Sequence, residues 1–327
     1  MNRKPILFAL LFFLTAAVLS LCLGAVALTP AELWSAVQNG PADPNGPIFW
    51  YARLPRTAAC LLAGAALSAS GAVIQTVLQN KLASPGIIGV NAGAGLAVTI
   101  ACALGAVSGW TVAGAAFLGA FTAVFLVLLA AEKAGASRTT VILGGVAVNS
   151  ILNALSEAIT TLVPDVAMLS REFRVGSFAA VAHTRLLPAA AVILVSLTAL
   201  LTVCGELDLL ALGDDTARSL GLAVKRYRML FLVLAALLAG AAVSFAGLLG
   251  FVGLIVPHAA RKLVGGESRR LLPLCILGGG GFVTLCDLVS RLLFRPYDLP
   301  AGILLSLLGG PFFLLLLWKR KGGRSHD

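Results

Sequence analysis

Residues 61–71 read LLAGAALSASG, and residues 237–247 read LLAGAAVSFAG. Eight of the eleven aligned positions are identical, at an offset of 176 residues. Both segments are apolar and rich in Ala, Gly and Ser. Such small residues let helices approach closely in lipid, where hydrophobicity itself gives no drive to associate. The pair therefore predicts two closely packed membrane helices in a chain that contains an internal repeat.

The composition indicates a membrane protein. The chain has 327 residues, of which 59% are hydrophobic and only 12% are charged, whereas about 25% of an ordinary soluble domain is charged. Helices are the expected spanning element, because backbone groups in lipid must be satisfied within their own segment. The strict alternation that a membrane barrel needs is absent. We therefore expect an all-α polytopic membrane protein with one transmembrane domain, residues 1–327.

Ten apolar stretches are candidates for membrane-spanning helices, which need about 20 residues each. They are residues 6–28, 54–78, 87–107, 110–131, 141–163, 186–204, 229–249, 251–264, 271–293 and 299–318. The eighth is the weakest, because it is short and contains Pro257. Gly247 to Gly250 is the expected break between the seventh and eighth spans.

The first span raises the alternative of a cleaved signal peptide, since Arg3 and Lys4 precede it and Ala25-Val26-Ala27 could be a cleavage site. The apolar run of residues 6–28 is longer than the usual core of about 7–15 residues. We therefore expect a retained first helix.

The distribution of Lys and Arg predicts the orientation. With the N-terminus inside, cytoplasmic segments hold 17 of the 24 basic residues and outer segments hold 7. This split obeys the positive-inside rule and places both termini in the cytoplasm. The net charge of +10 is thus explained by the excess of Lys and Arg in the predicted cytoplasmic segments. No dense basic-aromatic patch supports nucleic-acid binding.

The two repeated segments start spans two and seven, so five spans separate their starts and the second copy enters the membrane in the opposite direction. Inverted repeats are a recurring plan among transporters. We predict that spans 2–5 and 7–10 are the two repeats. The alternative is a chance match between two segments rich in Leu, Ala and Gly.

Polar residues follow one face of the fifth span at spacings of three and four. They are Asn149, Asn153, Ser156, Glu157, Thr160 and Thr161. Polar groups in lipid cost free energy, so we predict that the first five line a translocation path. The alternative is interhelical hydrogen bonding, worth about 1 kcal/mol per contact.

Charged residues gather at the predicted outer face. Asp287 and Arg291 stand at i and i+4 and are expected to form an ion pair. Arg53 and Arg56 precede the second span, and with Arg291 and Arg295 they could form a docking surface for acidic groups of a partner. The alternative is anchoring of these side chains at the membrane interface.

Two polar stretches are long enough to carry structure. In the external stretch 29–53, Thr29 and Glu32 predict a capping box at the start of a short helix through Leu33 and Trp34. The internal stretch 205–228 reads GELDLLALGDDTARSLGLAVKRYR. It predicts one short amphipathic helix between Gly213 and Gly221, with Asp214 or Asp215 at its start.

The motifs of catalysis are missing. The chain has no G-x-x-x-x-G-K-[ST] loop and no H-E-x-x-H, its three histidines are scattered, and none of its six cysteines forms a CxxC pair. We therefore expect no catalytic site, no metal site and no cofactor in this chain.

Several strings together resemble the iron-complex type of ABC importer permease, which moves siderophores, haem or cobalamin. They are RLPR at 53–56, LASPGIIGVNAGAG at 82–95, LALGDDTARSLG at 210–221, GFVGLIVPHAARKLVG at 250–265 and DLPAGI at 298–303. The sequence departs from the family pattern at Lys81, where the family has Pro, and at Asp298, where it has Glu.

The resemblance implies ten helices per subunit and a homodimer of two permeases in a bacterial cytoplasmic (inner) membrane. It also implies two cytoplasmic ATPase subunits that carry ATP and Mg, and an extracytoplasmic substrate-binding protein. Arg53, Arg56 and Arg291 would meet the binding protein. The ATPase would contact an internal coupling helix, with the residues Gly213, Asp214, Asp215, Ala217, Arg218, Leu220 and Gly221.

The main alternative is a secondary transporter with inverted repeats, driven by an ion gradient through Glu157 or Asp287 and needing no partner. An intramembrane enzyme is a third class, for which the sequence offers no catalytic constellation. The sequence leaves the transported chelate open.

Overall fold

A computed structural model of the chain describes residues 4–24, 26, 28–133, 137–293 and 297–321. Within these ranges the chain forms α-helices, three short helical turns and no β-strand. The α-helices are α1 Lys4–Cys22, α2 Pro30–Asn39, α3 Leu54–Val77, α4 Val90–Ala103, α5 Gly109–Lys133, α6 Arg138–Leu162, α7 Pro164–Val175, α8 His183–Thr202, α9 Cys204–Ala211, α10 Asp214–Ser219, α11 Val224–Ala246, α12 Val252–Val264, α13 Ser268–Leu293 and α14 Ala301–Lys321. The short turns are the 3-10 helices η1 Gly40–Ala42 and η3 Pro85–Ile88 and the π-helical turn η2 Ile48–Arg53.

Each of the ten predicted spans coincides with a helix. Seven helical stretches of the described chain are long and apolar enough to cross a membrane, namely α1, α3 with its η2 turn, α5, α6, α8, α11 and α13. Of the other three predicted spans, α4 and the stretch Ala301–Leu316 of α14 are shorter apolar helices, and the third is α12. Helix α4 has 14 residues and α12 has 13, so each rises only about 20 Å against a hydrocarbon core of about 30 Å.

The short helices have a local cause. The turn η3 and Gly89, at φ +98°, precede α4 and delay its start. The predicted break between the seventh and eighth spans is confirmed, because Gly247 ends α11 at φ +71° and Phe251 precedes α12 at φ +63°. A bulky residue rarely adopts this left-handed backbone, so the break is a defined feature of the fold.

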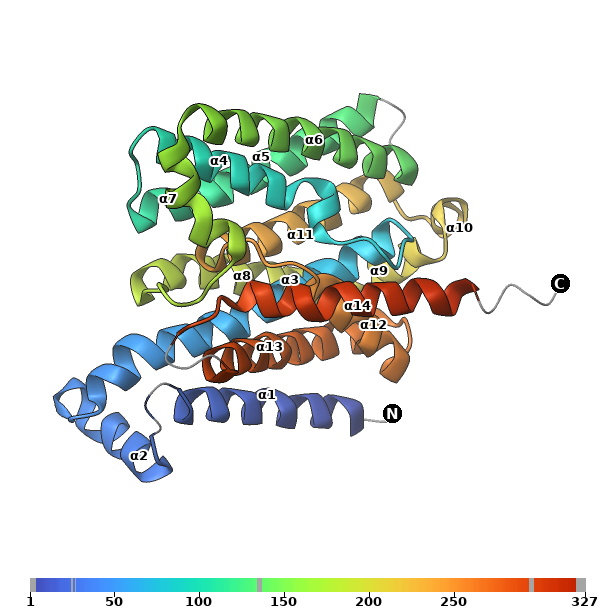
Figure 1. The fold of residues 1–327 in the computed structure, drawn as a ribbon. Helices are drawn as coiled ribbons and strands as arrows, with labels where there is room; N and C mark the ends of the chain where they lie inside the picture. The colour runs from blue at the N-terminus through green and yellow to red at the C-terminus, as the bar shows by residue number, and fades with distance from the viewer. Residues whose placement is uncertain (1–3, 25, 27, 134–136, 294–296, 322–327) are drawn as a thin grey trace.

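The helices form one bundle, seen from the side in Figure 1. Helices α3 and α11 run through its middle, α1 lies on α13 at one edge, and α6 lies at the opposite edge beside α4 and α5. Helix α10, the start of α1 and the end of α14 lie at one end of the bundle, whereas α2 and α7 lie at the other. Following the predicted orientation, we call the end with α10 the inner end and the opposite end the outer end.

The two predicted repeats pack in matching ways. The first helix of each packs against the third helix of the other, because α3 packs on α13 and α11 packs on α5. Helix α3 ends beside α9, where Gln79 donates to the carbonyl of Ala211, and α11 begins beside α10, where Arg228 meets Asp214. Helices α3 and α11 therefore run in opposite directions, as an inverted repeat requires.

The glycines of the repeated segment explain how closely α3 packs. A Cβ atom added to Gly64 would lie 2.1 Å from the carbonyl oxygen of Gly279, and one added to Gly71 would lie 2.0 Å from that of Gly253. In the second copy, a Cβ atom added to Gly240 would stay 3.4 Å from an α5 alanine. At the first aligned glycine, therefore, the first copy packs against backbone and the second against side chains. At the last aligned glycine, Gly247, the second copy also meets backbone, since an added Cβ atom would lie 2.5 Å from the carbonyl oxygen of Phe173.

Both predicted short helices form. Thr29 and Glu32 make the reciprocal bonds of a capping box at the start of α2, with the Thr29 amide 2.7 Å from the Glu32 carboxylate. The helix α10 lies between Gly213 and Gly221 as predicted.

Candidate functional site

Two glycines with positive φ bound the helix α10. Gly213 and Gly221 have φ values of +109° and +84°, a backbone region that only glycine adopts at little cost. Between them Ala217 is fully buried, whereas the side chain of Leu220 is 58% exposed. The helix therefore packs through one face and presents the other to solvent.

The first carboxylate of α10 points back into the protein. Asp214 lies 2.5 Å from the guanidinium of Arg228 on α11 and also pairs with Arg138 at the start of α6. Burial by itself raises the pKa of Asp214, but the hydrogen bonds and charges of Arg228 and Arg138 outweigh it, so the pKa lies below its usual range. Its neighbour Asp215 is fully exposed, 3.5 Å from Arg218 one turn further along α10.

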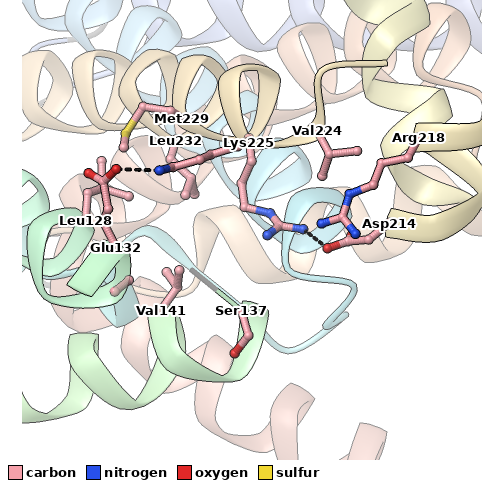
Figure 2. A pocket seen from close by; sticks show the side chains of 12 residues that line it. Leu128, Glu132, Ser137, Val141, Asp214, Arg218, Val224, Lys225, Met229 and Leu232 are labelled. Atoms are coloured by element: carbon pink, nitrogen blue, oxygen red, sulfur yellow. Dashed lines mark hydrogen bonds and ion pairs between the residues drawn. The ribbon is translucent and has the colours of Figure 1, made fainter. Parts of the chain in front are cut away.

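A cavity of about 440 Å³ is lined by α10, the first half of α11, the end of α5 and the start of α6. Figure 2 shows Asp214 at one side of it and the ion pair of Lys225 with Glu132, 2.5 Å apart, at the other. Apolar side chains such as Leu128 and Met229 complete the wall. The inner end thus combines ion pairs with open space.

The predicted path residues lie along one side of α6, where the buried face meets the exposed one. Asn149 donates to the carbonyl of Gly86 in η3 at 2.9 Å, and the hydroxyl of Ser156 lies 3.0 Å from that of Thr99 on α4. Thr160 is half-buried and donates to the helix backbone, whereas Asn153 and Glu157 are exposed. The structure thus brings the five together on α6, with some engaged in interhelical bonds, and their role in a path stays a prediction.

Sequence reasoning missed Arg174, which belongs to the same group. From the last turn of α7 it donates to Ser156 at 2.6 Å and lies 3.8 Å from Glu157. The sequence carries no periodic signal for this contact, because α6 and α7 are separate helices joined by a turn. The group therefore includes a cation as well as a carboxylate.

The predicted outer arginines point inward. Arg291 pairs with Asp287 at 3.0 Å, which confirms that ion pair, and Arg56 binds the same carboxylate at 3.0 Å. Arg53 donates to backbone carbonyls at the end of α1, including that of Cys22 at 2.7 Å. Arg295 lies outside the described residues.

These contacts bear on a docking role. The residues Arg53 and Arg291 are only 5% and 6% exposed, and Asp287 is completely buried. Of the three described arginines, Arg56 is the one that pairs with an exposed carboxylate, that of Asp298, at 2.7 Å. In this conformation the arginines join α1, α3 and α13 to one another, and docking of a partner through them stays a prediction.

Comparison with known proteins identifies the family. The model of the FecCD transport family matches residues 10–319 of this chain. The chain belongs to the FecCD transport family. The all-helical bundle, the glycine-bounded α10 and the broken helix pair α11–α12 are therefore features of a FecCD-family permease.

Named relatives of this FecCD-family chain are permeases. It is 32% identical to the hemin transport system permease protein HmuU of Yersinia pestis, with 97% of this chain and 96% of the relative covered. It is 35% identical to the vitamin B12 import system permease protein BtuC of Klebsiella pneumoniae, with 98% and 95% covered. The solved structure of a metal-chelate type ABC transporter in an inward-facing conformation matches with a TM-score of 0.86 at 30% identity, covering 97% of this chain and 100% of that one.

Family membership decides between the functions that the sequence left open. The full-length match to ABC permeases supports the permease hypothesis over an ion-driven secondary transporter or an intramembrane enzyme.

Proposed function

We propose that this FecCD-family chain is the permease subunit of an importer that moves an iron complex, haem or a related chelate such as cobalamin, driven by ATP hydrolysed in a separate subunit. The observation that carries this proposal is the family match over residues 10–319. The names of the haem and vitamin B12 relatives supply the substrate class.

The proposed assembly has two copies of the chain, two ATPase subunits that carry ATP and Mg, and an extracytoplasmic binding protein. Helix α10 is the proposed ATPase contact, through Gly213, Asp214, Asp215, Ala217, Arg218, Leu220 and Gly221. Its flanking glycines and its exposed Leu220 support this role. The exposed apolar residues Leu143, Ile151 and Leu155 of α6 support a second chain beside that helix.

The proposed path follows α6, with Asn149, Asn153, Ser156, Glu157 and Thr160 facing it. The exposure of Asn153 and Glu157 in the single chain supports a water-filled passage next to this helix. The proposed docking surface is formed by Arg53, Arg56, Arg291 and Arg295. Of the three described arginines, Arg56 reaches nearest to solvent, through its pair with Asp298.

The proposed location is the bacterial inner membrane, with both termini in the cytoplasm. The excess of Lys and Arg in the inner segments supports this orientation. The start of α1 and the end of α14 lie at the same end as α10, where an ATPase would have to bind.

Purification with candidate partners tests the proposal. The chain is co-expressed with candidate ATPase and binding-protein subunits from the same genome, and the complex is reconstituted into liposomes. We expect stoichiometric capture of the ATPase and vanadate-sensitive uptake of one of three probes: a ferric siderophore, haem or cyanocobalamin. Uptake by the chain alone, driven by an ion gradient and insensitive to vanadate, would contradict the proposal.

A further inference from the structure

A chain of polar contacts links the α10 loop to the first turn of α6. Asp214 at the start of α10 binds Arg138, the first residue of α6, and Arg228 of α11. Arg138 also donates to the side chain of Gln79 at the end of α3. The amide of Gln79 in turn donates to the carbonyl of Ala211, two residues before Gly213, at 3.0 Å. The loop that carries α10 is therefore joined to α6 on both sides of Gly213.

These contacts connect two groups of helices. Helix α10 packs on α9 and α11, whereas α6 packs on α4, α5, α7 and η3. The pair of Arg138 with Asp214 joins a member of one group to a member of the other. The side chains of Arg138 and Asp214 are 23% and 28% exposed, so the pair is partly shielded from water and keeps more of its attraction than a surface pair does.

The surroundings leave room for movement. The cavity of about 440 Å³ lies directly beside Asp214 and Arg228, and Ser137, which caps α6, lines it. Gly213 and Gly221 flank α10 at positive φ, where glycine can change its backbone dihedrals at little cost, so they are the expected hinges for a movement of α10. Gln79 itself sits at φ +48°, a left-handed conformation that costs free energy for a residue other than glycine. A strained residue, two hinges and a cavity thus surround the same ion pair.

Helix α6 can carry a displacement from one end to the other. It is continuous over 25 residues, about 37 Å, and its N-terminus is capped by Ser137. Arg138 stands at its inner end, and Asn149, Ser156 and Glu157 stand further along the same helix. A movement applied at Arg138 therefore shifts the polar side of α6 without any break in the helix.

We propose that Arg138 is a positioning residue that transmits the movement of α10 to α6, through its ion pair with Asp214 and its hydrogen bond with Gln79. This inference rests on the proposed function, because it assumes that an ATPase moves α10. It assigns a role in transport to Arg138 and Gln79, which lie outside the coupling loop itself.

The test follows α6 directly and needs no transported substrate. An environment-sensitive fluorophore is attached through Leu162→Cys, the last residue of α6 and 81% exposed, in a Cys22→Ser background because the other native cysteines are buried. The labelled permease is purified with its ATPase subunits. The change in emission on adding ATP and vanadate is recorded beside the rate of ATP hydrolysis.

Arg138→Gln should reduce the emission change per ATPase-bound complex by at least about fivefold, the lower limit of a typical allosteric coupling. Arg138→Lys, which retains the charge, should restore at least half of the change. The matched control is Lys225→Gln, which removes an ion pair from the same cavity without touching α10, and it should respond as the unmodified chain does.

The outcomes separate the two proposals. If Arg138→Gln captures the ATPase and α6 still responds fully, the role of Arg138 is wrong although the proposed function stands. If the Arg138→Gln variant does not assemble with the ATPase, the Asp214→Asn variant is tested in its place, because it removes the charge of the carboxylate and keeps the shape of the side chain. A full emission change from α6 in that variant would contradict the role of Arg138. If the unmodified chain captures no ATPase, both the proposed function and this inference are wrong.

Discussion

The two ends of the bundle each hold a carboxylate between two arginines, but the surroundings of the two clusters differ. At the outer end Asp287 is completely buried between Arg56 and Arg291. At the inner end Asp214 is 28% exposed between Arg138 and Arg228 and borders a cavity. Two clusters of the same composition, one Asp with two Arg, are thus fully buried at the outer end and next to a cavity at the inner end.

The difference teaches what each cluster can do. Asp287 joins α3 and α13, whose backbones already touch through Gly64 and Gly279. A charge in such a site cannot leave its partners without being stranded away from water. Asp214 joins α6, α10 and α11 beside open space, where a changed geometry costs less. The ion pairs of the outer cluster are therefore expected to keep one geometry, which makes it a fixed joint between helices, whereas those of the inner cluster can rearrange.

The largest expected effect comes from Asp287→Ala. It leaves two nearly buried guanidinium groups without their shared carboxylate, so we expect a loss of about 3–5 kcal/mol in the free energy of unfolding. Titration with SDS in detergent micelles measures it. The matched control is Asp298→Ala, which removes the half-exposed partner of Arg56 and should cost no more than about 1 kcal/mol. Equal losses in the two variants would contradict a fixed outer joint.

A smaller effect is expected from Asp214→Asn. The amide keeps the shape of the side chain but gives up two charge-assisted hydrogen bonds in a partly exposed site, so we expect a loss of about 1–2 kcal/mol. The same SDS titration measures it. A loss as large as that of Asp287→Ala would mean that the inner cluster is as rigid as the outer one.

Acid should weaken the inner cluster in a defined range. The pKa of Asp214 is lowered in the folded protein, so its charge stabilises the fold fully above the unfolded value near 3.9, and this contribution is lost as the pH falls through the lowered folded value. The difference in unfolding free energy between the unmodified chain and Asp214→Asn should therefore stay constant from about pH 7 to 5. A decline within that interval would contradict the lowered pKa.

The smallest effect is expected from Glu132→Gln. Its ion pair with Lys225 has both side chains substantially exposed, at 45% and 67%, so we expect at most about 1 kcal/mol, reduced further by salt. Unfolding measured at low and high ionic strength checks this. A loss that persists at high salt would show that this pair belongs to the shielded part of the inner end.

Sequence reasoning reached the local features of the fold. The ten spans, the break before α12, the capping box at Thr29 and the α10 helix all follow from the length of apolar stretches, glycine placement and short-range spacing. The pair of Asp287 with Arg291 was predictable for the same reason, because four residues along a helix bring side chains together.

The contacts between distant segments were beyond that reasoning. Arg56 meets Asp287 across 231 positions of sequence, and Arg138 meets Asp214 across 76. No periodic pattern encodes such a meeting, since it depends on how whole helices pack. The same limit explains why Arg53 was expected at the surface, although its guanidinium folds back onto the end of α1.

The packing of α3 also constrains how the chain can be made. Its glycine face meets α12 and α13, which the ribosome completes about 200 residues later. During synthesis α3 therefore enters the membrane before α12 and α13 exist, and its glycine face is in contact with lipid acyl chains until they are inserted. Assembly of the core is a late event in biosynthesis, and a chain truncated after α6 would carry an unfinished α3 into the reach of membrane proteases.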